Sequence, residues 1–285
     1  MSNPEDVSEH NREHYDSVTD AWAYLLGANL HYGFFAPGVT DLAEATDQMV
    51  WEMAAFAGLG KGAGSVLDVG CGIGHPAFLL HERYGCPVTG ITISRRGLEI
   101  AREQAGQRGI DEQSVRFVEA DALDNGLAAT SFDLLWQMES SHLIHDKIRL
   151  FQENHRVLRG GGTLVLCDLF LKRELSVVDI YNLKDELSLL EGSFGKAKMS
   201  TMPYYVDCLA QTGFDEIEVL DVTSQAKPTL AAWKQNVGIH REQIRQHLSP
   251  SAVDDFVMTC DIIENFFNQG LMGYGMIRAV RPGLA

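Results

Sequence analysis

The sequence predicts an α/β protein built on a doubly wound, mostly parallel sheet of seven strands. Short apolar runs alternate with helical patterns over residues 62–170, which is typical of parallel strands joined by covering helices. The first apolar run ends in a glycine-rich turn that leads into a helix, as expected for a β-α unit. At 285 residues, the chain is long enough for one large domain of this class with an insertion, or for two small domains.

Residues 1–60 are expected to be helical and to precede the sheet. Apolar residues recur at helical spacing over residues 16–26, and a second amphipathic stretch covers residues 41–57. Between them, residues 29–35 read Asn-Leu-His-Tyr-Gly-Phe-Phe. This aromatic run is either a connector packed on the core or part of a lid that closes over a site.

Residues 61–285 are expected to form the core, with a helical cap around residues 172–202, where the alternation of strand and helix breaks. We expect strands at residues 66–69, 87–93, 115–121, 131–138, 163–168, 216–222 and 271–280. Further helices are expected at residues 76–82, 95–107, 147–158, 204–212, 228–248 and 251–268. The glycines at positions 160–162 are expected to form a turn before the fifth strand.

Composition and charge exclude several classes of partner. The net charge of −16 repels phosphate backbones, so we expect no nucleic-acid partner. No run approaches the ~20 apolar residues of a membrane span, and the start of the chain is polar and acidic rather than a signal peptide. We therefore expect a cytoplasmic protein without a membrane partner, and the sequence leaves a homo-oligomer open.

Neither a disulfide framework nor a metal site is expected. The five cysteines are scattered and lack Cys-x-x-Cys spacing, which favours buried thiols. His142, His145 and Asp146 lie close together, but they follow a strand and lack the Glu of a zinc-protease pattern.

The glycine turn carries the strongest motif. Asp68 lies at the end of the first strand, and Gly70, Gly72 and Gly74 follow it. Without Cβ atoms, such a turn lets backbone N–H groups approach a ligand at the helix N-terminus. A dinucleotide fingerprint would need its third glycine at position 75, which is His75, so a nicotinamide dehydrogenase is disfavoured.

Residues 68–74, Asp-Val-Gly-Cys-Gly-Ile-Gly, resemble motif I of the class I S-adenosylmethionine-dependent methyltransferases. The resemblance implies a Rossmann-like methyltransferase fold and S-adenosylmethionine as the cofactor. It also implies that Asp68 and the backbone of the glycine turn hold the methionine end of the cofactor. Residues 29–35 resemble the His-x-Gly segment upstream of motif I in bacterial small-molecule and sterol methyltransferases, which favours the lid interpretation.

The same resemblance implies further cofactor contacts from Tyr24, His31, Thr92, Ser94, Asp121, Ala122 and Gln137. Two hydroxyl side chains, Thr92 and Ser94, would meet the ribose where many family members carry an acidic residue. The pair after the third strand, at positions 121 and 122, matches the adenine motif. Gln137 ends the fourth strand, where the family places residues close to the methionine part.

The segment after the fourth strand resembles the rebeccamycin-type sugar O-methyltransferases. Glu139, Ser140, His142 and Asp168 match that pattern, although the second histidine of the pattern is Leu143 here. The resemblance implies that His142 takes the proton of an acceptor hydroxyl and that Asp168 orients it.

Glu139 also matches the acidic position of the sterol, prenyl and teleocidin-type C-methyltransferases. In those enzymes a carboxylate and aromatic faces can stabilise a carbocation. The candidate aromatic wall residues are Tyr24, Tyr32, Tyr204, Tyr205, Phe266, Phe267 and Tyr274. The acceptor region lacks the Arg and Lys cluster that a diphosphate would need, so the expected partner is an uncharged small molecule.

The sequence thus predicts S-adenosylmethionine-dependent methyl transfer to a bulky, largely apolar small molecule of secondary metabolism, with Glu139, His142 and Asp168 as catalytic residues. Carbon methylation of a prenyl or terpenoid double bond is slightly favoured, and O-methylation of a sugar or another hydroxyl is the alternative. A non-catalytic S-adenosylmethionine-binding protein is the alternative from another class.

Overall fold

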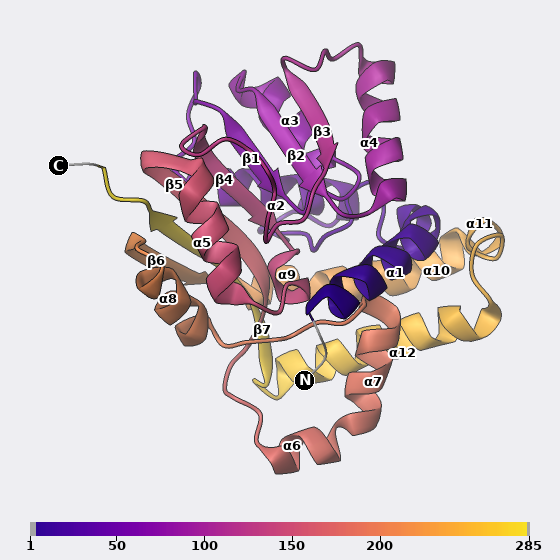
Figure 1. Cartoon of the computed structure of the whole chain (residues 1–285). Helices are drawn as coiled ribbons and strands as arrows, with labels where there is room; N and C mark the ends of the chain where they lie inside the picture. The colour runs from indigo at the N-terminus through magenta and orange to yellow at the C-terminus, as the bar shows by residue number, and fades with distance from the viewer. Residues whose placement is uncertain (1–3, 284–285) are drawn as a thin grey trace.

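The computed structural model describes residues 4–283 and confirms the predicted α/β class. Within that range, seven strands form one sheet in the order β3-β2-β1-β4-β5-β7-β6 (Figure 1). The strands are Val66–Val69 (β1), Val88–Thr92 (β2), Val115–Glu119 (β3), Phe132–Met138 (β4), Leu158–Leu171 (β5), Asp215–Asp221 (β6) and Met272–Val280 (β7). Strands β1 to β5 are parallel, whereas β7 is antiparallel to both β5 and β6. The order reverses between β1 and β4, and ligands bind at the carboxyl ends of strands beside such a reversal.

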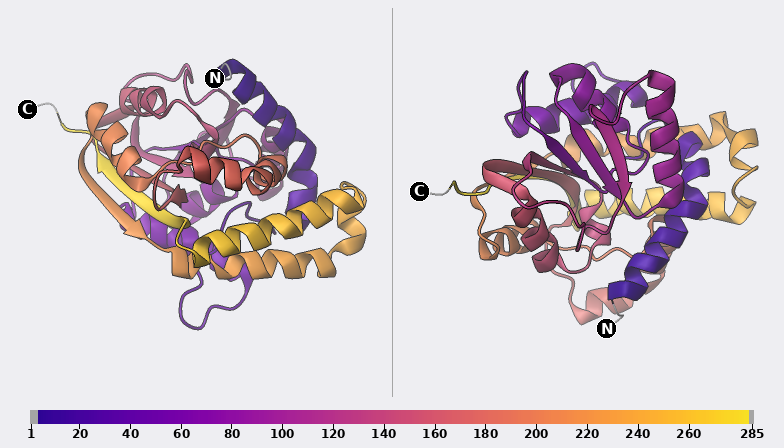
Figure 2. Two further views of the ribbon diagram at one scale, coloured as in Figure 1. Left: turned by 90° about the horizontal axis from the view of Figure 1, so that it is seen from below. Right: turned by 45° about the horizontal axis from the view of Figure 1, so that its top comes forward.

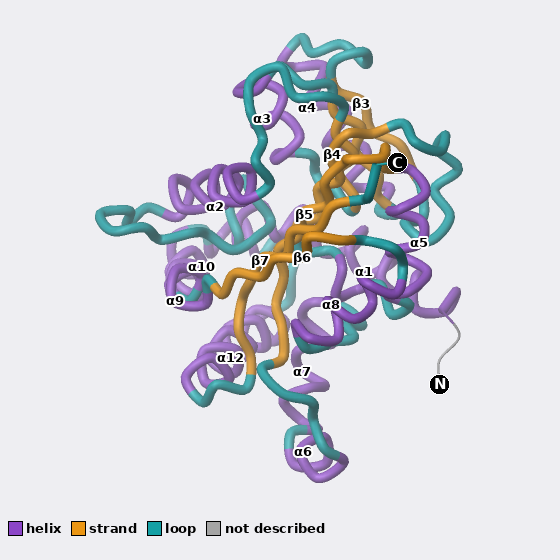
Figure 3. The backbone as a smooth tube through the Cα atoms, turned by 90° about the vertical axis from the view of Figure 1, so that its left-hand side faces the viewer, coloured by secondary structure: helices purple, strands orange, loops and turns teal. Residues whose placement is uncertain are grey.

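Helices cover both faces of this sheet. They are α2 (Leu42–Phe56), α3 (His75–Tyr84), α4 (Arg95–Arg108), α5 (Lys147–Val157) and α8 (Met202–Gln211). Because side chains alternate along a strand, Trp136 of β4 packs in the cluster that includes α2, α3 and α4, whereas Leu135 packs in the cluster with α5 and α8. Figure 3 shows α2 on one side of the sheet and α5 and α8 on the other. Both faces are therefore buried, as a parallel sheet requires.

The remaining helices gather beyond the carboxyl ends of the central strands (Figures 1 and 2). They are α1 (Pro4–Leu25), α6 (Val177–Asn182), α7 (Lys184–Phe194), α9 (Thr223–Ala226), α10 (Pro228–Ile239), α11 (Arg241–Ile244) and α12 (Pro250–Asn268). The cap is thus larger than expected, because the helices between β6 and β7 pack together with α1 and α7, which precede β6.

Some element boundaries differ from the prediction. Helix α1 begins at Pro4 rather than at residue 16, residues 195–201 are not helical, and the helix expected over 228–248 is divided between α10 and α11. Strand β5 runs through the glycines expected to form a turn, because Gly161 and Gly162 exchange backbone hydrogen bonds with Arg281 after β7. Pairing with a distant segment has overridden the local preference of glycine for turns.

None of the helices formed by residues 4–283 has both the length and the apolar character to cross a membrane.

Candidate active site

The glycine turn connects β1 to α3 at the reversal of strand order. Its backbone is left-handed at Gly70 (φ 82°) and Gly72 (φ 52°), which glycine adopts without steric cost. A Cβ on Gly70 would lie 2.3 Å from the Cβ of Ser140, whose hydroxyl donates to the carbonyl of Val69 at 2.6 Å. A Cβ on Gly72 would meet nothing within 4 Å, so this part of the turn borders open space.

That space is a cavity of about 400 Å³, within the size range of small-molecule sites. Its lining comes from the glycine turn, the ends of β2, β3 and β4, helices α1, α7, α10 and α12, and the loop before α2. Most of the lining side chains are apolar. Among the described residues, no Lys or Arg lines the cavity, and its titratable groups are histidines, carboxylates, Cys71 and two tyrosines.

Two buried polar groups border the cavity without a full set of partners. Asp68 is 2% exposed, and one of its carboxylate oxygens has no hydrogen-bond partner among residues 4–283. Burial raises the pKa of Asp68 to about 7. His31 directs Nδ1 to the carbonyl of Tyr32 at 2.8 Å, so the proton sits on Nδ1, and the buried Nε2 is an acceptor without a partner in that range. An unpaired buried carboxylate is costly, so a bound cationic group would stabilise it.

The end of β2 is occupied by hydroxyl groups and by a carboxylate from α1. Thr92 and Ser94 both border the cavity. The Ser94 hydroxyl accepts from the Gly97 N–H at 2.9 Å and donates to Asp16 at 2.7 Å. Asp16 is thus held at the strand end where the sequence itself lacks an acidic residue, and motif reading after β2 had no means of finding it.

Asp121 and Ala122 follow β3 and border the same cavity. One oxygen of Asp121 accepts from the Leu123 N–H at 2.8 Å, which shapes the turn. The structure therefore brings the turns after β1, β2 and β3 to one cavity, as their positions at parallel strand ends require.

Three residues expected to contact the cofactor do not line the cavity. Tyr24 packs against the rings of His240 and His247, with centroids 6.0 and 6.1 Å apart. Gly74 is the N-cap of α3, and the ring of Phe117 fills the space where its Cβ would be. Gln137 is fully buried and accepts from Asn154 of α5 at 3.3 Å, because strand alternation turns it away from the side of Met138.

Most of the aromatic residues that line the cavity differ from those expected from the sequence. Of the aromatics named from the sequence, Tyr32 lines the cavity, whereas Tyr24, Tyr204, Tyr205, Phe266, Phe267 and Tyr274 do not. The other aromatic lining residues are Tyr15, Trp22, Phe194 and Trp233. Tyr15 and Trp22 lie seven residues apart in α1, which places them on one helical face. The sequence had already indicated Trp22 as a ring that could face the sulfonium.

His142 and Asp168 meet in space. The 3₁₀ turn Ser141–Leu143 (η1) follows β4, and its His142 directs Nδ1 to Asp168 of β5 at 2.6 Å. Since a carboxylate only accepts there, Nδ1 carries the proton, and no bond to Nε2 comes from residues 4–283. His142 lines the cavity. Burial alone would raise the pKa of Asp168, but His142, Ser141 and the Leu169 N–H hold it below its ordinary value.

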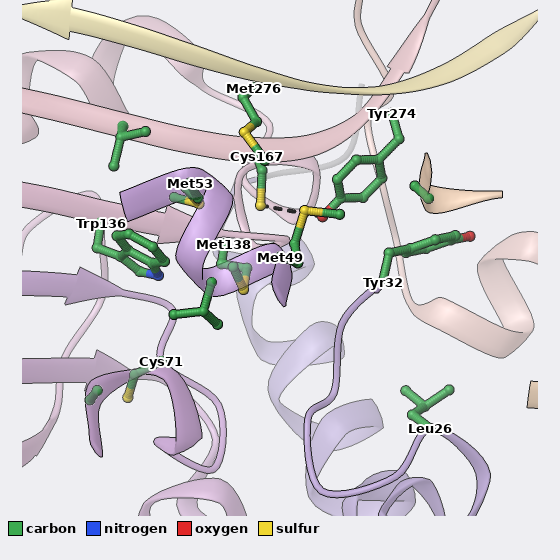
Figure 4. Packing of buried hydrophobic residues seen from close by; sticks show 14 of the residues in the cluster. Leu26, Tyr32, Met49, Met53, Cys71, Trp136, Met138, Cys167, Tyr274 and Met276 are labelled. Atoms are coloured by element: carbon green, nitrogen blue, oxygen red, sulfur yellow. Dashed lines mark hydrogen bonds between the residues drawn. The ribbon is translucent and has the colours of Figure 1, made fainter. Parts of the chain in front are cut away.

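Glu139 joins three segments at the end of β4. Its Oε1 accepts from the Tyr32 N–H at 2.7 Å and from the Tyr274 hydroxyl at 2.5 Å. Figure 4 shows the rings of Tyr32 and Tyr274 side by side, with the Tyr274 hydroxyl directed at Cys167. Burial raises the pKa of Glu139 to about 8. Its φ of 47° is unusual for a residue with a side chain, and such strain concentrates at functional sites.

Comparison with known proteins identifies the family. A family model described as "Methyltransferase domain" matches residues 67–166. "Methyltransferase GfsG" of Streptomyces halstedii is 31% identical over 223 residues, which cover 76% of this chain and 77% of that protein. The chain belongs to the S-adenosylmethionine-dependent methyltransferases.

Two further matches extend over nearly all of this methyltransferase. The "27-O-demethylrifamycin SV methyltransferase" of Amycolatopsis mediterranei (strain S699) is 29% identical over 268 residues, 94% of this chain and 95% of that protein. The crystal structure of the "[4+2]-Cyclase SpnF" superposes with a TM-score of 0.81 at 25% identity and covers 97% of both chains. The superposition on SpnF therefore includes the helical cap as well as the sheet.

Proposed function

We propose that this methyltransferase methylates a hydroxyl oxygen of a bulky, largely apolar and uncharged small molecule of secondary metabolism. The observation that carries the proposal is the hydrogen-bonded pair of His142 and Asp168 at the wall of an apolar cavity. A neutral imidazole held in one tautomer is suited to accept a proton from a hydroxyl group.

The described residues fit the cofactor. When bound, S-adenosylmethionine supplies a methyl group on a positively charged sulfonium. Asp68, with its unpaired carboxylate oxygen, would hold the ammonium of the methionine end, and the open side of the turn at Gly72 would leave room beside it. Thr92 would hydrogen-bond to the ribose, and Asp121 would accept a hydrogen bond from the adenine amine. We further propose that residues 1–60 act as a lid over a core formed by residues 61–285.

His142 acts as the general base in this proposal. Its Nε2 takes the proton of the acceptor hydroxyl, while Nδ1–H stays hydrogen-bonded to Asp168. The Asp168 carboxylate then stabilises the imidazolium that forms and keeps the ring in place. The apolar side chains of the cap keep water away from the reacting oxygen. Water in the site would otherwise compete with the substrate as methyl acceptor.

The cavity lining supports the class of acceptor. A diphosphate or phosphate ester would call for Lys, Arg or a metal, and no described Lys or Arg lines the cavity. No group of three or more His, Cys, Asp or Glu side chains among residues 4–283 is arranged to hold a metal ion. The apolar rings from α1, α7 and α10 suit a hydrophobic scaffold such as that of a polyketide or terpenoid.

Carbon methylation is the second candidate, and Glu139 favours it. Its carboxylate borders the cavity and, once ionised, would stabilise a carbocation left by methyl transfer to a double bond. The hydrogen bonds from Tyr32 and Tyr274 favour the ionised form, whereas burial opposes it. Oxygen methylation is preferred because it uses a base already paired with its orienting carboxylate.

A labelled-methyl screen tests the proposal. The protein is incubated with S-adenosylmethionine labelled in the methyl group and a set of hydroxylated polyketides, terpenoids and glycosides, and products are sought by mass spectrometry. We expect a gain of one methylene unit, with the label in a methoxy group by NMR. Label bonded to carbon would establish the second candidate instead. Cofactor binding without label transfer to any acceptor would contradict both.

A further inference from the structure

A buried hydrogen-bonded chain lies behind His142 on the side away from the cavity. The carboxylate of Asp168 accepts from the Ser141 hydroxyl at 2.5 Å and from the His142 N–H at 3.0 Å, in addition to His142 Nδ1. The Leu169 N–H donates to it at 2.8 Å. Asp168 is fully buried, so these four donors occupy the acceptor positions that a carboxylate offers.

The chain continues from Ser141 to Tyr205 of α8. The two hydroxyl oxygens are 2.9 Å apart, and Tyr205 is fully buried. Ser141 has one proton to donate and directs it to the anionic Asp168, so the Tyr205 hydroxyl must be the donor to Ser141. The direction of donation is therefore Tyr205 to Ser141 to Asp168, and each bond strengthens the next.

Lys147, in the first turn of α5, contacts the 3₁₀ turn η1 that carries Ser141 and His142. Its ammonium donates to the carbonyls of Ser141 and Ile144 at 2.8 and 2.5 Å, and it lies 5.4 Å from the centre of the Tyr205 ring. Lys147 is 1% exposed. Burial of a lysine ammonium costs free energy unless the charge is paired and hydrogen-bonded. We therefore expect Lys147 to have a role besides packing.

Resting on the proposed role of His142 as a base, we infer that Tyr205, Ser141 and Lys147 are positioning residues that hold His142 toward the cavity and restrain its basicity. The donors to Asp168 share the negative charge that would otherwise act on the imidazole alone. The Lys147 ammonium also attracts the Asp168 carboxylate, which further reduces the negative charge acting on the imidazole. Both effects weaken the electrostatic pull of Asp168 on the imidazole proton.

Other charged and titratable groups around this turn are accounted for separately. Glu139, which follows β4, and Tyr15 of α1 both interact electrostatically with Asp168. Lys198 and His145 lie close to Lys147. They are present in all the variants below, so they do not contribute to the differences between them. Burial lowers the pKa of Lys147 to about 8, while Asp168 opposes that shift, so Lys147 is charged over the range in which imidazole titrates.

The test is an NMR titration of histidine side chains in protein labelled with ¹³C-histidine and saturated with S-adenosylhomocysteine. The His142 signal is assigned by its loss in His142→Gln. In Tyr205→Phe and in Lys147→Met, we expect the His142 midpoint to rise by on the order of one pH unit. The matched control Tyr204→Phe alters the neighbouring, partly exposed tyrosine and should leave the midpoint unchanged, and Lys147→Arg should restore it.

The outcome separates this inference from the proposed function. An unchanged midpoint in Tyr205→Phe, in protein whose thermal unfolding matches the wild type, overturns the inference. Tyr205→Phe removes a single hydroxyl, so it carries the test even where Lys147→Met fails to fold. If the midpoint rises but His142→Gln still methylates an identified acceptor, the inference about basicity stands and the role of His142 as base falls.

Discussion

The two halves of the cavity are built in different ways. We call the part proposed to hold the cofactor the cofactor half, and the part proposed to hold the acceptor the acceptor half. The cofactor half comes from the turns after β1, β2 and β3, each of which directly follows its strand. The acceptor half comes from α1, the loop before α2, η1, α7, α10 and α12, which are separated by up to the length of the chain. A parallel sheet places its strand ends together whatever the side chains, whereas the acceptor half depends on how separate helices pack. The predictions below test whether the two halves also act separately.

The largest expected effect comes from the reacting end of the acceptor half. His142→Ala removes the base and should lower kcat for an identified acceptor by about 10²- to 10⁴-fold. The affinity for S-adenosylhomocysteine, measured by calorimetry, should stay close to that of the wild type. His247→Ala, an exposed histidine after α11, is the control. Loss of cofactor affinity together with turnover would show that the halves are coupled at this residue.

The next effect concerns the cofactor half. Asp68→Ala should weaken S-adenosylhomocysteine binding by about 10- to 100-fold, because a hydrogen bond to a charged group contributes ~1.5–3 kcal/mol. Isothermal titration calorimetry measures this directly, with Asp254→Ala on the exposed face of α12 as control. Unchanged affinity in Asp68→Ala would remove this carboxylate from the cofactor site.

A smaller effect is expected for the cap. The Phe194 ring lies 5.7 Å from that of Trp22 and 6.3 Å from that of Trp233, so it joins α7 to α1 and α10. Phe194→Ala should raise KM for the acceptor about tenfold through lost apolar contact, and leave cofactor affinity unchanged. Ile180→Ala, on the exposed helix α6, should change neither constant. An effect of Phe194→Ala on cofactor affinity alone would reverse the assignment of the two halves.

The smallest effect is a pH dependence. Burial raises the pKa of Asp68 to about 7 in the free protein, and a bound ammonium would lower it again. The ligand therefore prefers the ionised form, and its affinity should fall as pH decreases below about 7, by at most tenfold per pH unit. In the free protein the same raised pKa makes ionised Asp68 destabilising, so its contribution to folding stability declines as pH rises above its unfolded value. Asp68→Asn should abolish this part of the pH dependence, and a pH profile identical to the wild type would contradict it.

Prediction from sequence succeeded where the chain is locally informative. The strands, the glycine turn and the alternation of helices were readable, because spacing and glycine chemistry act over a few residues. The family resemblance implied that Asp168 orients His142, and the structure brings them together because His142 follows β4 and Asp168 lies in its parallel neighbour β5. Tyr24 and Gln137 do not line the cavity, because the direction of each side chain depends on which neighbouring surface buries it. Asp16 was missed because only the packing of α1 across the end of β2 brings it there.

By itself, the sequence determined the strands of the sheet and the methyltransferase family, since both depend on local pattern. Tertiary structure alone decided which aromatic rings face the cavity and how Tyr205, Ser141 and Lys147 surround Asp168. The physical reason is that hydrogen bonds and ring contacts between distant segments depend on helix orientation. That orientation results from the packing of the whole cap against the sheet.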